Sequence, residues 1–250
     1  MPASYSAQPT RNILIIGATG VIGTYITRAI LDARDNFDRI CVLTSQKTLV
    51  QKVQDIAALD AWGVEIFTGR LEKESAVKRA YEGTPFTHRP ASPGGTGLDE
   101  TNAGRKWIGI DTVVSCVGRG GIEKQINLIT WAEQAGVRRF FTSEYGTDIE
   151  YWPESAHEPP HQLKLKVRAH MKTMKRLEYT YLVTGPYSDL YFGTMKARPE
   201  LGQFDVKEKK AVLLGDGEGP VSFTAMAEYV PLLVMKMGPW LTARPVLGNL

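Results

Sequence analysis

A lysine and an arginine, Lys164 and Arg168, lie four residues apart in a segment whose pattern predicts a helix over Leu163–Arg176. That spacing places both side chains on one face of a helix. A lysine held in a partly desolvated pocket has a lowered pKa and can act as a general acid or base. Lys164 is therefore a candidate catalytic residue; the alternative is a pair of solvated basic residues on a helix face.

Three glycines spaced three residues apart, Gly17, Gly20 and Gly23, follow the apolar run Asn12–Ile16 and open a predicted helix at Val21. Gly17 permits a sharp turn off the strand, Gly20 lets a pyrophosphate approach the backbone, and Gly23 lets the helix pack close to the sheet. The helix N-terminus offers N–H groups and partial positive charge to phosphates. The predicted dinucleotide contacts are Gly17, Ala18, Thr19, Gly20, Val21, Ile22 and Gly23. The alternative is a tight turn without a ligand.

The residues after the second predicted strand indicate which dinucleotide binds. Sites that prefer NAD usually place a carboxylate here to bind the ribose hydroxyls. In this chain Ser45 and Gln46 are uncharged, Lys47 is basic, and the next acidic residue is Asp55. Hydroxyls and a lysine suit a 2′-phosphate, so Ser45 and Lys47 are predicted cofactor contacts and NADP is favoured over NAD. The alternative is that Lys47 is a solvated loop lysine.

Two more strand ends carry residues suited to the same site. The fourth predicted strand ends in Val117 and Gly118, in a glycine-rich turn that we expect to pass close to the nicotinamide. The fifth is followed by Ser143, Glu144 and Tyr145. Because ligands of open α/β sheets bind at the carboxyl edge of the strands, we predict that Ser143 and Tyr145 lie near the substrate.

The elements that must position these residues alternate between strand and helix. The predicted strands are Asn12–Ile16, Arg39–Thr44, Val64–Thr68, Asp111–Val117, Arg138–Thr142 and Tyr179–Thr184. The predicted helices are Val21–Ala33, Val50–Ala61, Ser75–Tyr81, Glu123–Gln134 and Leu163–Arg176. Continuous apolar strands are typical of a sheet covered on both faces. The pattern predicts an α/β fold with a Rossmann-type doubly wound parallel sheet.

The composition excludes several classes of function. The chain has 250 residues, and 30 Lys and Arg against 27 Asp and Glu give a net charge of only +3, which argues against nucleic acid or a membrane surface as partner. No apolar run is long enough to span a membrane, and the N-terminus lacks the apolar core of a signal peptide. Cys41 and Cys116 lie in apolar runs and are expected to be reduced and buried. We expect a cytoplasmic protein that binds a small molecule.

One segment imitates a zinc motif. Residues 157–161 read HEPPH, which matches H-E-x-x-H, but Pro159 and Pro160 prevent the helical turn that would align both histidines. We predict no metal and interpret the segment as an extended lead into the helix at Leu163. Other catalytic patterns are missing as well: the chain contains no Tyr-x-x-x-Lys pair, no G-x-S-x-G elbow and no Walker sequence.

Four motifs together resemble the NmrA-like group of atypical short-chain dehydrogenases, in particular its isoflavone reductase and phenylcoumaran benzylic ether reductase branch. They are GATGVIG at residues 17–23, RRFFTSEYG at 138–146, the lysine and arginine at 164 and 168, and VLLGDG at 212–217. The resemblance runs from Asn12 to Ala227. It implies a Rossmann domain, NADPH, a small second domain over the substrate, and a lysine general acid or base near the nicotinamide. That lysine maps to Lys164, which then also contacts the cofactor, or to Lys166 if the register shifts by two.

The chain departs from the family pattern at three places. Where the family has an arginine for the 2′-phosphate, this chain has Ser45, so the preference for NADP rests on Lys47. Where the family has Gly-Asp after the third strand, this chain has Gly69 and Arg70, and Arg70 is predicted to reach the adenine end of the cofactor. The substrate-binding portion after Ala227 is expected to be truncated.

These observations divide the chain into three regions. Residues 1–10 are predicted to be a flexible N-terminus, 11–185 the NAD(P)-binding domain, and 186–250 a partial substrate-binding region. Residues 84–107 interrupt the domain and are interpreted as a solvated insertion, with a substrate lid as the alternative. Tyr187, Tyr191 and Phe192 either line the substrate pocket or pack in the core.

The resemblance and the residues together predict an NADPH-dependent reductase of a small aromatic or polyketide-type secondary metabolite. The cofactor would supply the hydride, and Lys164 would supply or relay a proton to the developing oxyanion. The alternative is a non-catalytic redox sensor of the NmrA type that binds NAD(P) and regulates a protein partner.

Overall fold

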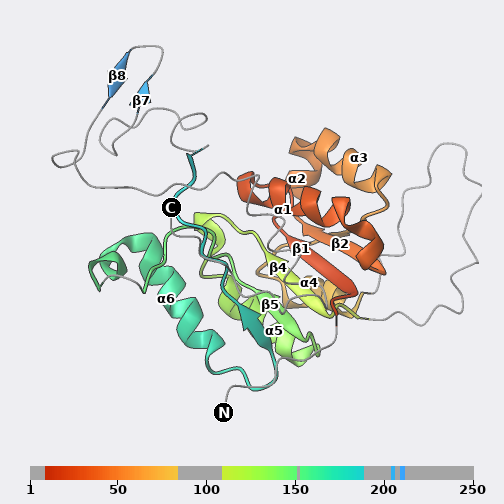
Figure 1. Ribbon diagram of the computed structural model, residues 1–250. Helices are drawn as coiled ribbons and strands as arrows, with labels where there is room; N and C mark the ends of the chain where they lie inside the picture. Colours follow the sequence, from red (N-terminus) through yellow and green to blue (C-terminus); the bar gives the residue numbers. More distant parts are fainter. Residues whose placement is uncertain (1–8, 84–108, 151–152, 189–203, 206–208, 212–250) are drawn as a thin grey trace, which may run out of the picture.

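A six-stranded parallel sheet forms the centre of the molecule. The computed structural model describes residues 9–83, 109–150, 153–188, 204–205 and 209–211. The strands are β1 (Asn12–Ile16), β2 (Arg39–Thr44), β3 (Glu65–Thr68), β4 (Thr112–Ser115), β5 (Arg139–Phe141) and β6 (Glu178–Thr180). Their order is β3-β2-β1-β4-β5-β6, as Figure 1 shows for the labelled part. This is the doubly wound order of a Rossmann fold, so the predicted fold class is confirmed.

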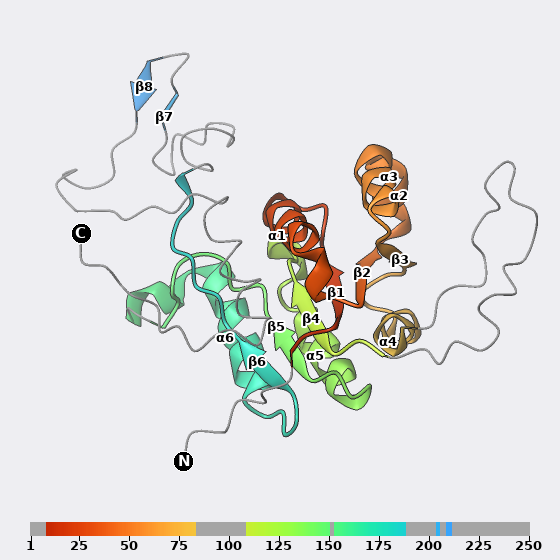
Figure 2. The same cartoon turned by 45° about the vertical axis from the view of Figure 1, so that its right-hand side comes forward.

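Helices cover both faces of this sheet (Figure 2). They are α1 (Val21–Asp32), α2 (Gln46–Gln51), α3 (Val53–Ala61), α4 (Glu74–Glu82), α5 (Gln125–Gln134) and α6 (Pro159–Met171). Within the described residues, three short 3-10 helices lie in the connections: Arg34–Asn36, Arg119–Gly121 and Pro153–His157. Residues of α4, α5 and α6 belong to one core cluster, and residues of α1 and α3 belong to the other.

The apolar strands supply both cores because successive side chains point to opposite faces. Leu14 and Ile16 of β1 pack in the cluster with α4, α5 and α6, whereas Ile13 and Ile15 pack in the cluster with α1 and α3. All five residues of β1 are buried. Burial on both faces is the reason why the strand sequence is continuously apolar.

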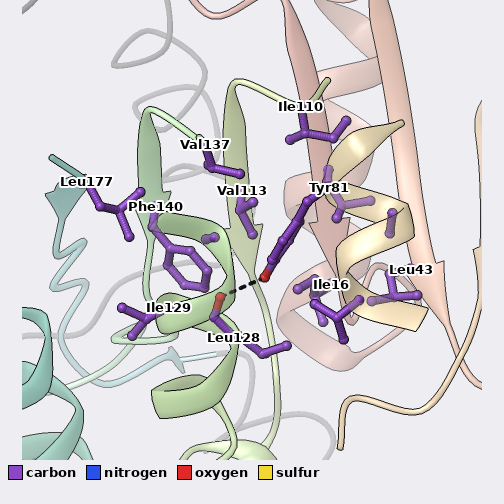
Figure 3. Close-up of a cluster of buried hydrophobic side chains, with 14 of the residues drawn as sticks. Ile16, Leu43, Tyr81, Ile110, Val113, Leu128, Ile129, Val137, Phe140 and Leu177 are labelled. Carbon is purple, nitrogen blue, oxygen red and sulfur yellow. Dashed lines mark hydrogen bonds between the residues drawn. The ribbon is translucent and has the colours of Figure 1, made fainter. Parts of the chain in front are cut away.

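Tyr81 of α4 is the largest fully buried side chain of the first cluster (Figure 3). Its hydroxyl donates a hydrogen bond of 3.0 Å to the backbone carbonyl of Leu128 in α5. A buried polar group needs such a partner, since leaving it unpaired costs about 1–3 kcal/mol. The contact joins α4 to α5, and burial raises the pKa of the Tyr81 phenol.

Two helix boundaries differ from the prediction. The single helix expected over Val50–Ala61 is two helices, α2 and α3, because the backbone of Lys52 leaves the helical region at φ −126° and ψ 45°. The last helix begins at Pro159 instead of Leu163 and ends at Met171 instead of Arg176. Prolines at the first two helical positions lack N–H groups that would have no helical partner there, so they start the helix instead of preceding it.

The N-terminal boundary also differs. Thr10, predicted to be part of a flexible N-terminus, is 2% exposed, and its hydroxyl lies 2.9 Å from that of Thr112 in β4. The carbonyl of Pro9 accepts a hydrogen bond from Arg138. These contacts fix Pro9 and Thr10 against the sheet.

Both cysteines are unpaired and buried, as predicted. Burial raises the pKa of the Cys41 and Cys116 thiols to about 12. No helix in the described part of the chain is long and apolar enough to cross a membrane. A two-stranded antiparallel sheet, β7 (Phe204–Asp205) with β8 (Lys210–Ala211), completes the described elements.

Candidate functional site

The glycine loop, residues 17–23, leaves β1 where the sheet order changes direction between β1 and β4. Gly17 has φ +84°, a conformation that L side chains rarely adopt. A Cβ atom at Gly17 would also lie 2.6 Å from the carbonyl oxygen of Cys116, which follows β4. Gly17 is thus required by both its backbone angle and the closeness of the neighbouring strand end. Ligands of doubly wound sheets bind at this kind of switch point.

The start of α1 presents backbone N–H groups that have no partner within the helix. Gly20 is the N-cap, and it makes no side-chain capping hydrogen bond. The first N–H groups of a helix have no partner within the helix, and here Val21, Ile22 and Gly23 supply them. A Cβ atom at Gly23 would overlap the carbonyl oxygen of Gly17, so only glycine lets α1 begin this close to the loop. An uncapped helix start of this geometry fits a pyrophosphate.

Lys52 adds a positive charge to this loop, which the sequence analysis missed. It lies at the break between α2 and α3, and its ammonium group donates a hydrogen bond to the backbone carbonyl of Thr19. The same group lies 3.7 Å from the carboxylate of Asp55. The spacing of residues gave no signal of this contact, because it depends on the irregular backbone of Lys52.

Ser45 and Lys47, the two residues predicted to contact the 2′-phosphate, both lie at the start of α2, but their surroundings differ. Ser45 is the N-cap of α2, and its hydroxyl oxygen accepts the N–H of Thr48 at 3.2 Å. Lys47 is exposed and belongs to the first turn of α2; its contact with a 2′-phosphate stays a prediction, as does the alternative of a solvated lysine. Within the described part of the chain, the Lys47 ammonium has no hydrogen-bond or ion-pair partner.

Arg70 follows β3 and is exposed. Its guanidinium lies 3.5 Å from the carboxylate of Glu72, which also pairs with Lys124 of the β4–α5 connection at 2.5 Å. The N–H of the preceding Gly69 donates to the carbonyl of Thr44 at the end of β2. Arg70 therefore stands at the carboxyl edge of the sheet, beside the end of β2, and its contact with adenine stays a prediction.

Ser143 joins the ends of β4 and β5. Its hydroxyl donates a hydrogen bond of 2.8 Å to the carbonyl of Val117, and its N–H donates to the side-chain oxygen of Gln125 at 2.8 Å. Ser143 is 8% exposed. The hydroxyl proton of Ser143 is thus donated to another protein group, next to the turn at Gly118. Contact of Ser143 with a substrate stays a prediction.

Glu144 makes two different contacts with α6. Its backbone carbonyl accepts a hydrogen bond of 3.0 Å from the Lys164 ammonium. Its carboxylate accepts one of 2.9 Å from the Arg168 guanidinium, in a pair whose side chains are only 1% and 4% exposed. The structure therefore confirms that Lys164 and Arg168 share one helix face, and this face points to the end of β5.

Lys164 is a partly buried lysine at the carboxyl edge of the sheet. Burial lowers its pKa, the negative charge of Glu144 opposes this change, and the positive charges of Arg168 and Arg119 add to it. A neutral fraction of lysine can accept a proton and the charged fraction can donate one. Lys166, the alternative, is exposed and pairs with Glu123 of the β4–α5 connection at 3.2 Å.

The structure describes two tyrosines of the predicted substrate pocket, Tyr145 and Tyr187. The hydroxyl group of each contacts another side chain of the protein. The thiol of Cys116 lies 3.9 Å from the Tyr145 hydroxyl, and burial together with Cys116 raises the pKa of Tyr145. The Tyr187 hydroxyl accepts a hydrogen bond of 2.7 Å from Thr184, and Tyr187 is 6% exposed. Tyr145 packs against the core cluster that includes Cys116 and Ala18, and contact of either tyrosine with a substrate stays a prediction.

Comparison with known proteins agrees with this arrangement. A sequence model of the NmrA-like family matches residues 9–215. The chain belongs to the NmrA-like family. Among curated relatives, phenylcoumaran benzylic ether reductase PT1 of Pinus taeda is 27% identical over 215 residues, which are 84% of this chain and 59% of that protein. Isoflavone reductase homolog A622-like of Nicotiana tabacum is 28% identical over 233 residues, 90% of this chain and 63% of that protein.

Solved structures share the NmrA-like fold. A structure of the pinoresinol-lariciresinol and phenylcoumaran benzylic ether reductases aligns with a TM-score of 0.69 at 20% identity, covering 92% of this chain and 66% of that one. Leucoanthocyanidin reductase of Vitis vinifera bound to NADPH aligns with a TM-score of 0.61 at 24% identity, covering 91% and 64%. The chain spans about 60% of the length of the curated relatives that it matches.

The HEPPH segment of this NmrA-like chain does not form a zinc motif. His157 lies in the 3-10 helix before α6, and His161 lies inside α6, where its Nδ1 contacts the carbonyl of Ser155 at 2.7 Å. The part of the chain that the structure describes contains no group of three or more His, Cys, Asp or Glu side chains that could hold a metal ion.

Several predicted features fall outside the described residues. They are Tyr191 and Phe192 of the substrate pocket, the VLLGDG motif at 212–217, the insertion at 84–107 and most of the region 186–250. The predicted site residues that the structure does describe follow the ends of the six parallel strands or, in the case of Lys164, lie in α6.

Proposed function

We propose that this NmrA-like chain is an NADPH-dependent oxidoreductase of the isoflavone reductase type that acts on a small aromatic or polyketide-type metabolite. The observation that carries the proposal is the position of Lys164, a lysine with a lowered pKa at the same sheet edge as the glycine loop. The curated relatives are named as reductases, which supports the reaction class.

The glycine loop and the start of α1 would hold the pyrophosphate of NADPH. Lys52 and Lys47 are the lysines available for its 2′-phosphate, Lys52 through its position at Thr19 and Lys47 from the first turn of α2. One solved relative binds NADPH and another, AtPrR2, binds NADP+ and (+)-pinoresinol. When bound, NADPH supplies the hydride, and the protein contributes orientation and electrostatics.

Lys164 would provide the proton chemistry. Its ammonium group, desolvated and fixed by the Glu144 carbonyl, would donate a proton to the oxyanion that develops on the substrate. Val117 and Gly118, at the turn after β4, would border the nicotinamide, and Ser143 and Tyr145 would lie on the substrate side.

The test combines binding and turnover. We expect NADPH to bind the full chain in a calorimetric titration, and we expect oxidation of NADPH in the presence of (+)-pinoresinol or an isoflavone. Lys164→Ala should keep NADPH binding and lower turnover about 100-fold or more, whereas Lys166→Ala should change neither. A chain that fails to bind NADPH contradicts the proposal. Binding without any Lys164-dependent turnover would assign the chain to the redox-sensor class.

A further inference from the structure

One residue of the loop after β5 contacts both members of the lysine–arginine pair on α6. The Glu144 carbonyl holds the Lys164 ammonium at 3.0 Å, and the Glu144 carboxylate pairs with Arg168 at 2.9 Å. We propose that Glu144 is the positioning residue of Lys164, fixing its ammonium through the backbone carbonyl and supplying a nearby negative charge through a carboxylate that Arg168 holds in place.

The backbone of Glu144 is held from several sides, so its carbonyl has a defined direction. Ser143, just before it, is bonded to Val117 and Gln125. The N–H of Glu144 donates to the carbonyl of Thr142 at 2.8 Å, and the carbonyl of Gly146 accepts the N–H groups of Thr184 and Gly185 at 3.1 and 2.9 Å. The loop is thereby fastened to the strand ends on both sides of it.

The carboxylate of Glu144 is equally fixed, through Arg168. The other end of the Arg168 guanidinium donates to Glu150 at 2.8 Å, and its central carbon lies 4.7 Å from the centre of the Tyr181 ring. An arginine held by these two contacts is a rigid donor for its remaining partner, Glu144. The charge of Glu144 consequently stays in place while Lys164 gains or loses its proton.

Three charged groups and burial decide the protonation of Lys164. Glu144 favours the ammonium form, whereas Arg168 on the same helix and Arg119 on the turn after β4 disfavour it, as burial does. Glu144 has a larger effect than either arginine. Removing its charge must shift Lys164 further toward the neutral amine.

This inference rests on the proposed function, because a positioned lysine matters only if Lys164 carries the proton chemistry. Its test does not need a substrate. Competitive acetylation with acetic anhydride labels unprotonated amines, so mass spectrometry of labelling against pH gives the titration midpoint of Lys164. Lys166 in the same peptide, resolved by fragment ions, is an exposed internal reference.

We expect Glu144→Gln to lower the Lys164 midpoint by about half a unit to one unit while Lys166 stays unchanged. The matched control is Glu150→Gln, which also removes a carboxylate from Arg168 at 2.8 Å, but one whose charge is not among those that shift the pKa of Lys164. It should leave the Lys164 midpoint in place. Glu144→Asp, which keeps the charge, should restore most of the wild-type value.

An unchanged Lys164 midpoint in Glu144→Gln, or an equal fall in Glu150→Gln, overturns the inference. If Glu144→Gln does not fold, the double variant Glu144→Gln with Arg168→Gln replaces the buried ion pair by two amides. Its midpoint should also fall, since Glu144 outweighs Arg168, and an unchanged or raised midpoint overturns the inference. NADPH titration of the same wild-type sample tests the proposed function separately from the inference about Glu144. A wild-type protein that does not bind NADPH contradicts the proposed function but not the role of Glu144.

Discussion

Arg168 and Glu144 form an ion pair of 2.9 Å in which both side chains are almost completely buried. The pair joins α6 to the end of β5 across an interval of 24 residues in the chain. A buried pair of this kind is costly to break from one side, because the remaining charge has lost its partner in a place that water does not reach.

Arg168→Met is therefore expected to lower the free energy of unfolding by about 3–5 kcal/mol. Urea denaturation followed by circular dichroism measures the change. Lys172→Ala is the comparison, since Lys172 pairs with Glu150 at 3.8 Å and is 61% exposed. It should cost less than about 1 kcal/mol. Equal losses in the two variants would contradict the structural importance of the buried pair.

Gly20→Asp should abolish NADPH binding. The backbone of Gly20 tolerates a side chain, with φ −75°, so the variant should fold. A carboxylate at the N-cap would place negative charge where the pyrophosphate is proposed to bind. Gly20→Ala adds only a methyl group, 3.1 Å from the Gly17 carbonyl oxygen, and should weaken binding less. Calorimetric titration with NADPH distinguishes the two, and wild-type affinity in Gly20→Asp would rule out this loop as the cofactor site.

Lys52→Ala is expected to weaken NADPH more than NADH, by about tenfold or more if one charge-assisted contact of roughly 1.5–3 kcal/mol to the 2′-phosphate is lost. Lys47→Ala should also weaken NADPH binding more than NADH binding, but by a smaller factor, because Lys47 is not held against the glycine loop as Lys52 is. Affinities for both cofactors, measured in parallel by fluorescence, provide the comparison. Equal losses of NADPH and NADH in both variants would remove the two lysines from 2′-phosphate recognition.

The lowered pKa of Lys164 makes the stability of the fold depend on pH. Between this lowered pKa and the usual value of 10.5, the unfolded chain binds more protons than the folded chain. The free energy of unfolding of the wild type, relative to Lys164→Met, should therefore rise with pH across that window. Urea denaturation at pH 7, 8, 9 and 10 measures the trend, and Lys166→Met is the control. A constant difference between wild type and Lys164→Met would show that burial leaves Lys164 unperturbed.

The fold and the glycine loop were predictable because their causes are local. Continuous apolar runs such as Asn12–Ile16 report burial on both faces, and the glycine spacing reports a turn of the backbone. The predicted start of α6 is wrong by four residues, because the prediction assigns the two adjacent prolines to an extended segment although the first helical positions accept them. The break at Lys52 had no such local marker, and the single helix predicted there was wrong.

The amino-acid sequence by itself determined the order of strands and helices, the glycine loop and the placement of Lys164 and Arg168 on one helix face, since each depends on the spacing of neighbouring residues. Only the tertiary structure decided which groups these residues contact. In the folded chain the Arg168 guanidinium pairs with the buried carboxylate of Glu144, and the Lys164 ammonium donates to the carbonyl of the same residue. The Lys52 ammonium donates to a carbonyl of the glycine loop. Such contacts join segments distant in the chain, and their geometry is set by how helices pack on the sheet.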